Sequence, residues 1–175
     1  MGKFLKPIEH VANVLIIVVA VVCLAIVAQR YLRPAPPAPA APPGLPAMKS
    51  PAIGSKISSL DINWSQNKKN VLLVLQEGCR YCSESADFYK NLVQQTKDKG
   101  VSVTAVLPQD REAARKYLDK LQLPEIDAQQ SALNSLDVNA TPTLIVADDK
   151  GQVEKVWIGK LPSEKQNEVL AMLLK

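Results

Sequence analysis

The sequence predicts an α/β fold in which helices flank a mixed central sheet, with one transmembrane helix before the folded domain. Short apolar runs alternate with amphipathic stretches, and a polar turn separates the last two runs, as in a sheet that ends in a hairpin. An uncharged stretch near the amino terminus predicts the membrane-spanning helix. The 175 residues therefore divide into a membrane anchor over residues 1–32, a Pro/Ala-rich linker over 33–53 and a globular domain over 54–175.

The uncharged stretch covers residues 11–29, about the length that a helix needs to cross the hydrocarbon layer. A cleaved signal peptide is the main alternative, but the stretch is long and no clean A-x-A cleavage site follows it. A buried core helix is the third interpretation, and Cys23 within the stretch is interpreted as a small packing residue. Two lysines precede the stretch and two arginines follow it, so the charge pattern only slightly favours a cytoplasmic amino terminus.

Residues 34–51 consist mostly of proline and alanine, so they cannot form a core and favour the extended polyproline II conformation. At about 3.1 Å per residue, the segment could hold the domain up to roughly 55 Å from a bilayer. A ligand for an SH3-type domain is the alternative, but no basic residue lies inside the proline run. We therefore interpret the segment as a spacer.

The net charge of +4 lies outside the folded domain. Five of the 21 Lys and Arg residues and one of the 17 Asp and Glu residues precede Ser55, so the rest of the chain is formally neutral. A nucleic-acid-binding domain carries its positive charge on its own folded surface. The charge distribution therefore argues against nucleic acid as a partner.

The first half of the domain predicts two buried strands, each followed by a helix. The apolar run over residues 71–75 is typical of a strand covered on both faces, and residues 101–107 predict a second. Between them, the stretch 83–99 places its apolar residues on one helical face, and a glycine ends it. Asp110 is a candidate cap for a helix that runs to about Leu123. The expected inner face of this helix carries Ala113, Tyr117, Leu118 and Leu121.

The second half predicts a short helical piece, a hairpin and a closing helix. The helical piece covers residues 130–136. Residues 144–147 and 153–158 predict antiparallel strands joined by a polar turn. Pro162 and Ser163 open the last amphipathic helix. Its expected apolar residues are Val169, Leu170, Leu173 and Leu174.

Cys79 and Cys82 are spaced C-x-x-C, directly after a predicted strand and at the start of a predicted helix. A zinc site needs about four ligands, yet the domain has no further cysteine, and the chain has no histidine beyond His10. A purely structural disulfide would gain little stability from so short a loop. The third interpretation is a redox pair, because the free N–H groups at a helix start favour a thiolate. Cys79 would then be the exposed nucleophile, Cys82 would resolve the mixed disulfide, and Arg80 would either stabilise the thiolate or be simply solvated.

From about Gly54 to the carboxyl end, the chain resembles the thioredoxin superfamily, and within it the membrane-anchored, exported thiol:disulfide interchange proteins of the TlpA and redoxin type. The resemblance is carried by residues 71–75, Gly78-Cys79-Arg80-Tyr81-Cys82, Leu136-Asp137-Val138, Thr141-Pro142-Thr143-Leu144, and Gly151 with Gly159. It implies a thioredoxin-like fold with a cis peptide bond before Pro142, which would sit against the active disulfide. Residues 109–127 resemble the helix-bearing insertion of redoxins.

The chain also departs from the family pattern. Gly78 replaces the usual aromatic residue before the first cysteine and Tyr81 the usual proline before the second, so the motif is similar to those of glutaredoxins and bacterial disulfide isomerases. Leu73 lies where thioredoxins carry a buried acid, and Ser85 lies where an acidic residue commonly follows the second cysteine. Glu77 is either a proton relay to the buried thiol or a solvated residue at a loop edge. A peroxiredoxin is disfavoured because the P-x-x-x-T/S-x-x-C pattern is missing.

Together, the residues and the resemblance predict a thiol–disulfide oxidoreductase on the extracytoplasmic (periplasmic) side of a membrane, more as a reductase than as an oxidase of client proteins. The expected site residues are Cys79, Cys82 and Pro142 for catalysis and Thr141, Arg80 and Tyr81 for client binding. No cofactor is expected, because the two sulfurs hold both electrons, and a transmembrane donor would re-reduce the pair. Two alternatives remain: a non-catalytic thioredoxin-fold module that holds a client at the membrane, and a cytosolic redox protein anchored from inside.

Overall fold

The computed structural model describes residues 17–24 and 47–175 of the chain. Residues 17–24 form a helix, and the residues from 47 onward belong to a separate compact unit. The expected membrane-spanning helix over 11–29 and the expected linker over 33–53 lie largely outside the described residues. Within the described ranges, no helix combines the length and the apolar character needed to cross a membrane.

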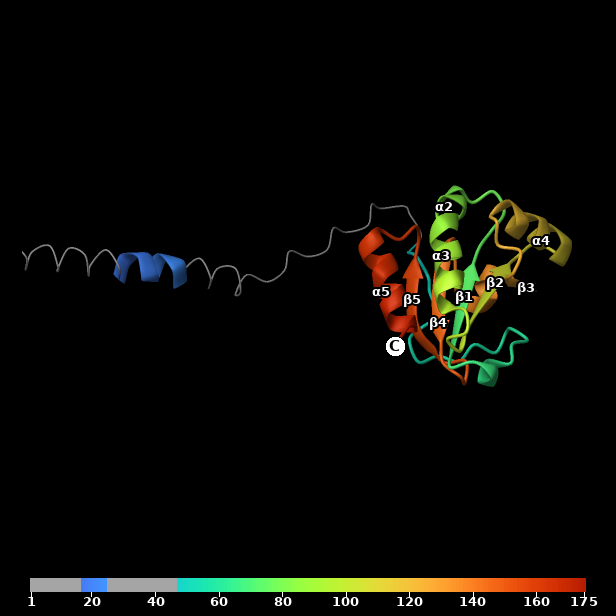
Figure 1. Ribbon diagram of the computed structural model, residues 1–175, viewed down its shortest axis with the longest axis horizontal. Coiled ribbons are helices and arrows are strands. Elements are labelled where there is room, and N and C mark those ends of the chain that lie inside the picture. The colour runs from blue at the N-terminus through green and yellow to red at the C-terminus, as the bar shows by residue number, and fades with distance from the viewer. Residues whose placement is uncertain (1–16, 25–46) are drawn as a thin grey trace, which may run out of the picture. The chain divides into compact units, whose positions relative to one another are not determined.

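Five strands form one mixed sheet in the order β3–β2–β1–β4–β5 (Figure 1). β1 pairs parallel with β2, and β2 with β3, whereas the pairs β1–β4 and β4–β5 are antiparallel. The strands are β1 (Lys69–Val74), β2 (Val101–Leu107), β3 (Asp127–Gln130), β4 (Thr143–Ala147) and β5 (Val153–Ile158). The predicted mixed sheet is confirmed, and β2 and β5 coincide with their predicted ranges.

β1 is the central strand and is covered on both faces, as its apolar run predicts. Val71 and Leu73 join the larger hydrophobic cluster, and Leu72 and Val74 join the smaller one on the other face. Successive side chains of a strand point to opposite faces, so a strand with both faces buried needs apolar residues at every position. The same logic explains β4, all of whose side chains are buried.

Four helices pack on the larger cluster. They are α2 (Arg80–Glu84), α3 (Ala86–Thr96), α4 (Arg111–Lys120) and α5 (Ser163–Leu173). Figure 1 shows α3 in front of the sheet, with α5 on the side of β5 and α4 on the side of β3. The opposite face is covered by Ile57 and Leu60 from the amino-terminal segment and by Leu136 of the 3₁₀ helix η2 (Leu133–Leu136). A second 3₁₀ helix, η1 (Trp64–Gln66), precedes β1.

The helix predicted over 83–99 differs from the structure in three ways. It begins earlier, at Arg80, it breaks at Ser85 into α2 and α3, and it ends earlier, at Thr96. The Ser85 hydroxyl donates a hydrogen bond to the carbonyl of Tyr81 at 2.8 Å. A serine that bonds back to the preceding turn in this way often bends a helix.

The helical piece predicted over 130–136 is confirmed in its second half, where η2 lies. Its first residue, Gln130, instead belongs to the edge strand β3 (Asp127–Gln130), which the sequence did not predict. The strand sequence Asp-Ala-Gln-Gln has no apolar alternation, because an edge strand with exposed side chains does not require it. Its partners are Thr104 to Leu107 of β2, a pairing between distant segments.

The α4 prediction is confirmed at its start. The Asp110 carboxylate accepts the N–H of Ala113 at 2.9 Å, as a helix cap does. The helix ends at Lys120, somewhat before the predicted Leu123. On its inner face, Ala114 is buried in place of Ala113, and Tyr117 and Leu118 are buried as predicted.

Gly151 lies in the turn between β4 and β5 and has no room for a side chain. Its φ is +75°, and an added Cβ would lie 2.8 Å from Cε2 of the Trp64 ring. We expect Gly151→Ala to lower the free energy of unfolding by about 2 kcal/mol, through backbone strain together with displacement of the indole. Urea denaturation would measure the loss.

Gly54→Ala is the matched control for this substitution. Gly54 has a φ of +84°, but nothing lies within 4 Å of its added Cβ. Gly54→Ala therefore measures the backbone strain alone, for which we expect a loss of about 1 kcal/mol in the free energy of unfolding. Equal losses in the two variants would show that the contact with Trp64 contributes nothing.

Candidate active site

The disulfide between Cys79 and Cys82 lies just beyond the carboxyl end of β1, where the chain turns into α2. Their Cα atoms are 5.3 Å apart. Gly78 has a φ of +78°, a left-handed conformation that glycine adopts without strain, and it lets the chain reverse before the first cysteine. Cys79 is the N-cap of α2, and its Sγ accepts the N–H of Cys82 at 3.1 Å. The predicted position of the pair between strand and helix is confirmed.

The two sulfurs lie in different surroundings. The side chain of Cys82 is 0% exposed and belongs to the larger hydrophobic cluster. Cys79 is half-buried and lies at the edge of this cluster. Of the two, solvent therefore reaches only Cys79, and another thiol or disulfide could approach only that side of the pair.

A second loop faces Cys79. The peptide bond between Thr141 and Pro142 is cis, as the resemblance implied. The carbonyl oxygen of Thr141 lies 3.5 Å from Sγ of Cys79. The loop is fixed on both sides, since Thr143 donates its hydroxyl to the carbonyl of Ala140 at 2.8 Å and Pro142 accepts the N–H of Gly159 at 2.7 Å. Pro142 is buried, so the loop presents the backbone of Thr141 to the disulfide.

Charged side chains surround the exposed side of α2. Nε of Arg80 is 2.6 Å from one carboxylate oxygen of Glu84, and Nζ of Lys160 is 2.9 Å from the other. Hydrogen bonds from Lys160 and then from Arg80 lower the pKa of Glu84. Arg80 is thus paired within its own helix, an arrangement that its position next to Cys79 did not reveal. Tyr81 is 55% exposed beside the disulfide.

Glu77 is exposed on the loop before the cysteines, and its carboxylate lies 3.7 Å from Nζ of Lys120. Of the two interpretations of Glu77, this position agrees with a solvated residue at a loop edge. Among the residues that the structure describes, no group of three or more His, Cys, Asp or Glu side chains could hold a metal ion.

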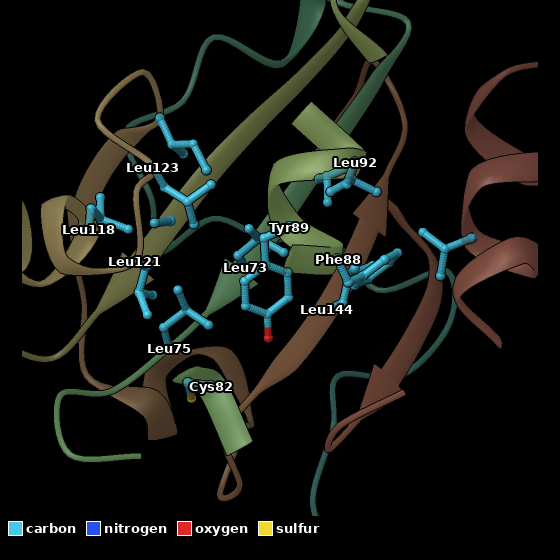
Figure 2. Close-up of a cluster of buried hydrophobic side chains, with 14 of the residues drawn as sticks. Leu73, Leu75, Cys82, Phe88, Tyr89, Leu92, Leu118, Leu121, Leu123 and Leu144 are labelled. Atoms are coloured by element: carbon cyan, nitrogen blue, oxygen red, sulfur yellow. The ribbon is translucent and has the colours of Figure 1, made fainter. Parts of the chain in front are cut away.

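The larger cluster contains two buried tyrosines, Tyr89 of α3 and Tyr117 of α4. Figure 2 shows Tyr89 in this cluster together with Cys82 and Leu73. Burial raises the pKa of both phenols, and the neighbouring hydroxyls of Ser85 and Ser83 partly offset this. The apolar spacing of α4 indicated that Tyr117 points inward, but no local pattern relates either phenol to the cysteines.

Comparison with known proteins agrees with this geometry. The family model for redoxins matches residues 40–173, which is most of the chain. No curated protein sequence matches the chain at a significant level.

Several solved structures share the fold at low sequence identity. The thioredoxin domain of a thiol-disulfide oxidoreductase from Bacteroides vulgatus has a TM-score of 0.58 and 16% identity, covering 72% of this chain and 100% of that one. A protein assigned as the thiol:disulfide interchange protein DsbE, from Chlorobium tepidum, has a TM-score of 0.57 and 22% identity, covering 71% and 99%. A thiol-disulfide isomerase from Corynebacterium glutamicum has a TM-score of 0.54 and 17% identity, covering 73% and 96%.

The family match covers far more than half of the chain, and the matched region includes the strand–disulfide–helix junction and the cis-proline loop. The chain belongs to the redoxin family and is a thioredoxin-like thiol–disulfide oxidoreductase.

Proposed function

We propose that this protein reduces disulfides of client proteins on the extracytoplasmic side of a membrane, to which residues 11–29 anchor it. The observation that carries the proposal is the asymmetry of the disulfide. Cys79 is half-buried and adjoins an open backbone carbonyl, whereas Cys82 is fully buried behind it. Such a pair can make and release one covalent bond to a client.

In the proposed reaction the reduced protein starts with Cys79 as a thiolate, stabilised by the N–H of Cys82. The thiolate attacks one sulfur of the client disulfide, forming a mixed disulfide and releasing the other client sulfur as a thiolate, which takes a proton from water. Cys82 then loses its proton to water and attacks Sγ of Cys79. The internal disulfide forms, and the client leaves with both of its sulfurs reduced.

The loop of Thr141 and Pro142 is proposed to hold the client during this exchange. The carbonyl of Thr141 faces Sγ of Cys79, so an extended client segment could pair with this backbone as an added strand. Exposed Tyr81 offers an aromatic contact beside the pair. Arg80 is proposed to contact acidic client groups. It would either leave Glu84 to do so or contact the client while it stays paired with Glu84.

The location and the electron donor are further parts of the proposal. The uncharged stretch over 11–29 would anchor the chain, the proline-rich linker would hold the domain away from the bilayer, and a transmembrane donor would re-reduce the pair.

The proposed location can be tested with protease. Protease added to intact spheroplasts should digest the domain. Protection until the membrane is broken would place the domain in the cytoplasm.

A reductase should hold its cysteines mostly as free thiols in unstressed cells. We therefore expect acid trapping followed by alkylation to label Cys79 and Cys82, and we expect a reduction potential nearer to about −270 mV than to about −120 mV. The hydrogen bond from the N–H of Cys82 acts in the opposite direction, because it stabilises the reduced form. A fully oxidised pair in cells, with a potential at the oxidising end, would identify an oxidase instead.

A further inference from the structure

The first residues that the structure describes in the compact unit are held beside the loop of Thr141 and Pro142 by one side chain. The carboxamide of Asn139 donates from Nδ2 to the carbonyl of Ala47 at 2.9 Å, and its Oδ1 accepts the N–H of Lys49 at 2.6 Å. Asn139 comes two residues before Thr141, and two residues of chain span at most about 7 Å. Residues 47–49, the clasped segment, therefore lie close to the carbonyl that faces Cys79.

The two hydrogen bonds bind the backbone of the clasped segment and not its side chains. In an extended segment, the carbonyl of one residue and the N–H of the second residue after it point to the same side. A carboxamide carries a donor and an acceptor side by side, so it can bind both groups at once. The side chains of residues 47–49 are exposed. Asn139 thus binds an extended peptide without regard to its sequence, and the clasped segment is the peptide bound to it.

The clasped segment is attached more weakly than the residues that follow it. Gly54 donates its N–H to the carbonyl of Val153 at 2.7 Å, and the side chain of Ile57 is buried in the smaller cluster. Within the described part of the chain, residues 47–49 make no hydrogen bond other than the two with Asn139. The clasped segment can therefore leave the carboxamide while the rest of the domain stays folded.

An extended client that is bonded to Cys79 and paired with Thr141 would reach the same carboxamide. At about 3.3 Å per residue, a client residue two or three positions from the bonded cysteine comes as far as Asn139. Its backbone would need the same donor and acceptor that now bind Ala47 and Lys49. One edge of a carboxamide cannot hold two segments in this way, so the client and the clasped segment compete for it.

We propose that Asn139 is a client-binding residue and that the clasped segment occupies it until a client takes its place. This inference rests on the proposed function, because it extends the client-binding loop from Thr141 to Asn139. The ligand is an extended peptide that is bound through its backbone. The clasped segment lowers the affinity for clients by competition, and it keeps the carboxamide hydrogen-bonded when no client is present.

The first test is the displacement of the clasped segment. In the full-length protein with Cys23→Ser and Cys82→Ser, purified in mild detergent, Cys79 is the only cysteine left. A short peptide of serine and threonine with one central cysteine, activated as its disulfide with thionitrobenzoate, is then attached. The Cys79 thiolate bonds to the peptide sulfur, and thionitrobenzoate leaves with the electron pair of the broken bond. Hydrogen exchange at the Lys49 amide should be about tenfold faster with the peptide attached than with cysteine alone attached. Equal exchange in the two products would overturn the inference.

The second test weakens the clasp from the side of the segment. Lys49→Pro removes the N–H that Asn139 accepts, and proline suits an extended backbone. Lys49→Ala is the matched control, because it removes the same charge and keeps the N–H. The measured quantity is the rate of thionitrobenzoate release with the activated peptide, divided by the rate with activated cysteine. This ratio should rise about threefold in Lys49→Pro, as for the loss of one neutral hydrogen bond, and keep the parent value in Lys49→Ala.

Asn139→Ala distinguishes competition from obstruction. It removes the clasp and the proposed client site together, so the ratio should fall below the parent value. Asn134→Ala, an exposed position on η2, is its control and should keep the parent value. The inference is overturned if Lys49→Pro and Lys49→Ala agree, or if Asn139→Ala raises the ratio as Lys49→Pro does. Both tests attach the peptide chemically, so failure to reduce insulin would count against the proposed function alone.

Discussion

Replacing Cys82 with serine is expected to convert a transient mixed disulfide into a stable one. In the proposed reaction, Cys79 makes the first attack alone, and the Cys82 sulfur is needed only to displace the client. Cys82→Ser should therefore accumulate a covalent complex through Cys79, whereas Cys79→Ser should form none. Both variants should lose insulin reduction completely. Non-reducing gels with mass spectrometry would detect the complex, and insulin turbidity would measure the activity.

Cys23→Ser is the control for these variants, since Cys23 is the third cysteine of the chain and is free. It should keep full activity and trap no client. A complex that forms through Cys82 in Cys79→Ser would reverse the proposed roles. That outcome would require the fully buried sulfur to be the accessible one.

Asn70→Ala is expected to cause the largest loss of stability of any single polar substitution proposed here. Asn70 lies on β1 and is 1% exposed. Its Nδ2 donates to the carbonyls of Trp64 and Asp148, each at 3.1 Å, and its Oδ1 accepts the hydroxyl of Ser102 at 2.8 Å. Alanine would remove this donor from the carbonyls of two half-buried residues and the acceptor from the Ser102 hydroxyl, so we expect a loss of about 3 kcal/mol in the free energy of unfolding.

Urea denaturation of Asn70→Ala, with Asn167→Ala as the control, would check this value. Asn167 is exposed on α5, so its substitution should change the free energy of unfolding by less than about 0.5 kcal/mol. Similar small changes in both variants would mean that the three hydrogen bonds of Asn70 contribute little beyond those that water makes in the unfolded chain.

Much of the fold could be predicted because it depends on short-range patterns. β1, β2 and β5 are apolar or alternating runs bounded by glycine, proline or charged residues, and their burial requires those residue types. The Asp110 cap is equally local, since a carboxylate can reach an N–H three residues ahead. The cysteine pair was found for the same reason: its spacing and its position after a strand are both visible in the chain.

The prediction of a cis bond before Pro142 had a different source. Most bonds before proline are trans, so the residues alone would have favoured the wrong isomer. The resemblance to a family supplied the prediction, and the structure confirms it. By contrast, the polar strand β3 gave no signal at all, because its place in the sheet depends on pairing with β2.

The sequence by itself determined the order of most elements and the position of the cysteine pair after a strand, because these follow from residue type and local spacing. That Leu73 lies where thioredoxins carry a buried acid came from the resemblance to the family. Only the tertiary structure decided what surrounds the two sulfurs. It placed the carbonyl of Thr141 beside Cys79, paired Arg80 and Lys160 with Glu84, and buried Cys82 in the larger hydrophobic cluster. These groups come from the loop before β4, from α2 and from the loop after β5. Contacts between such distant segments arise from the packing of the whole core, which no local pattern encodes.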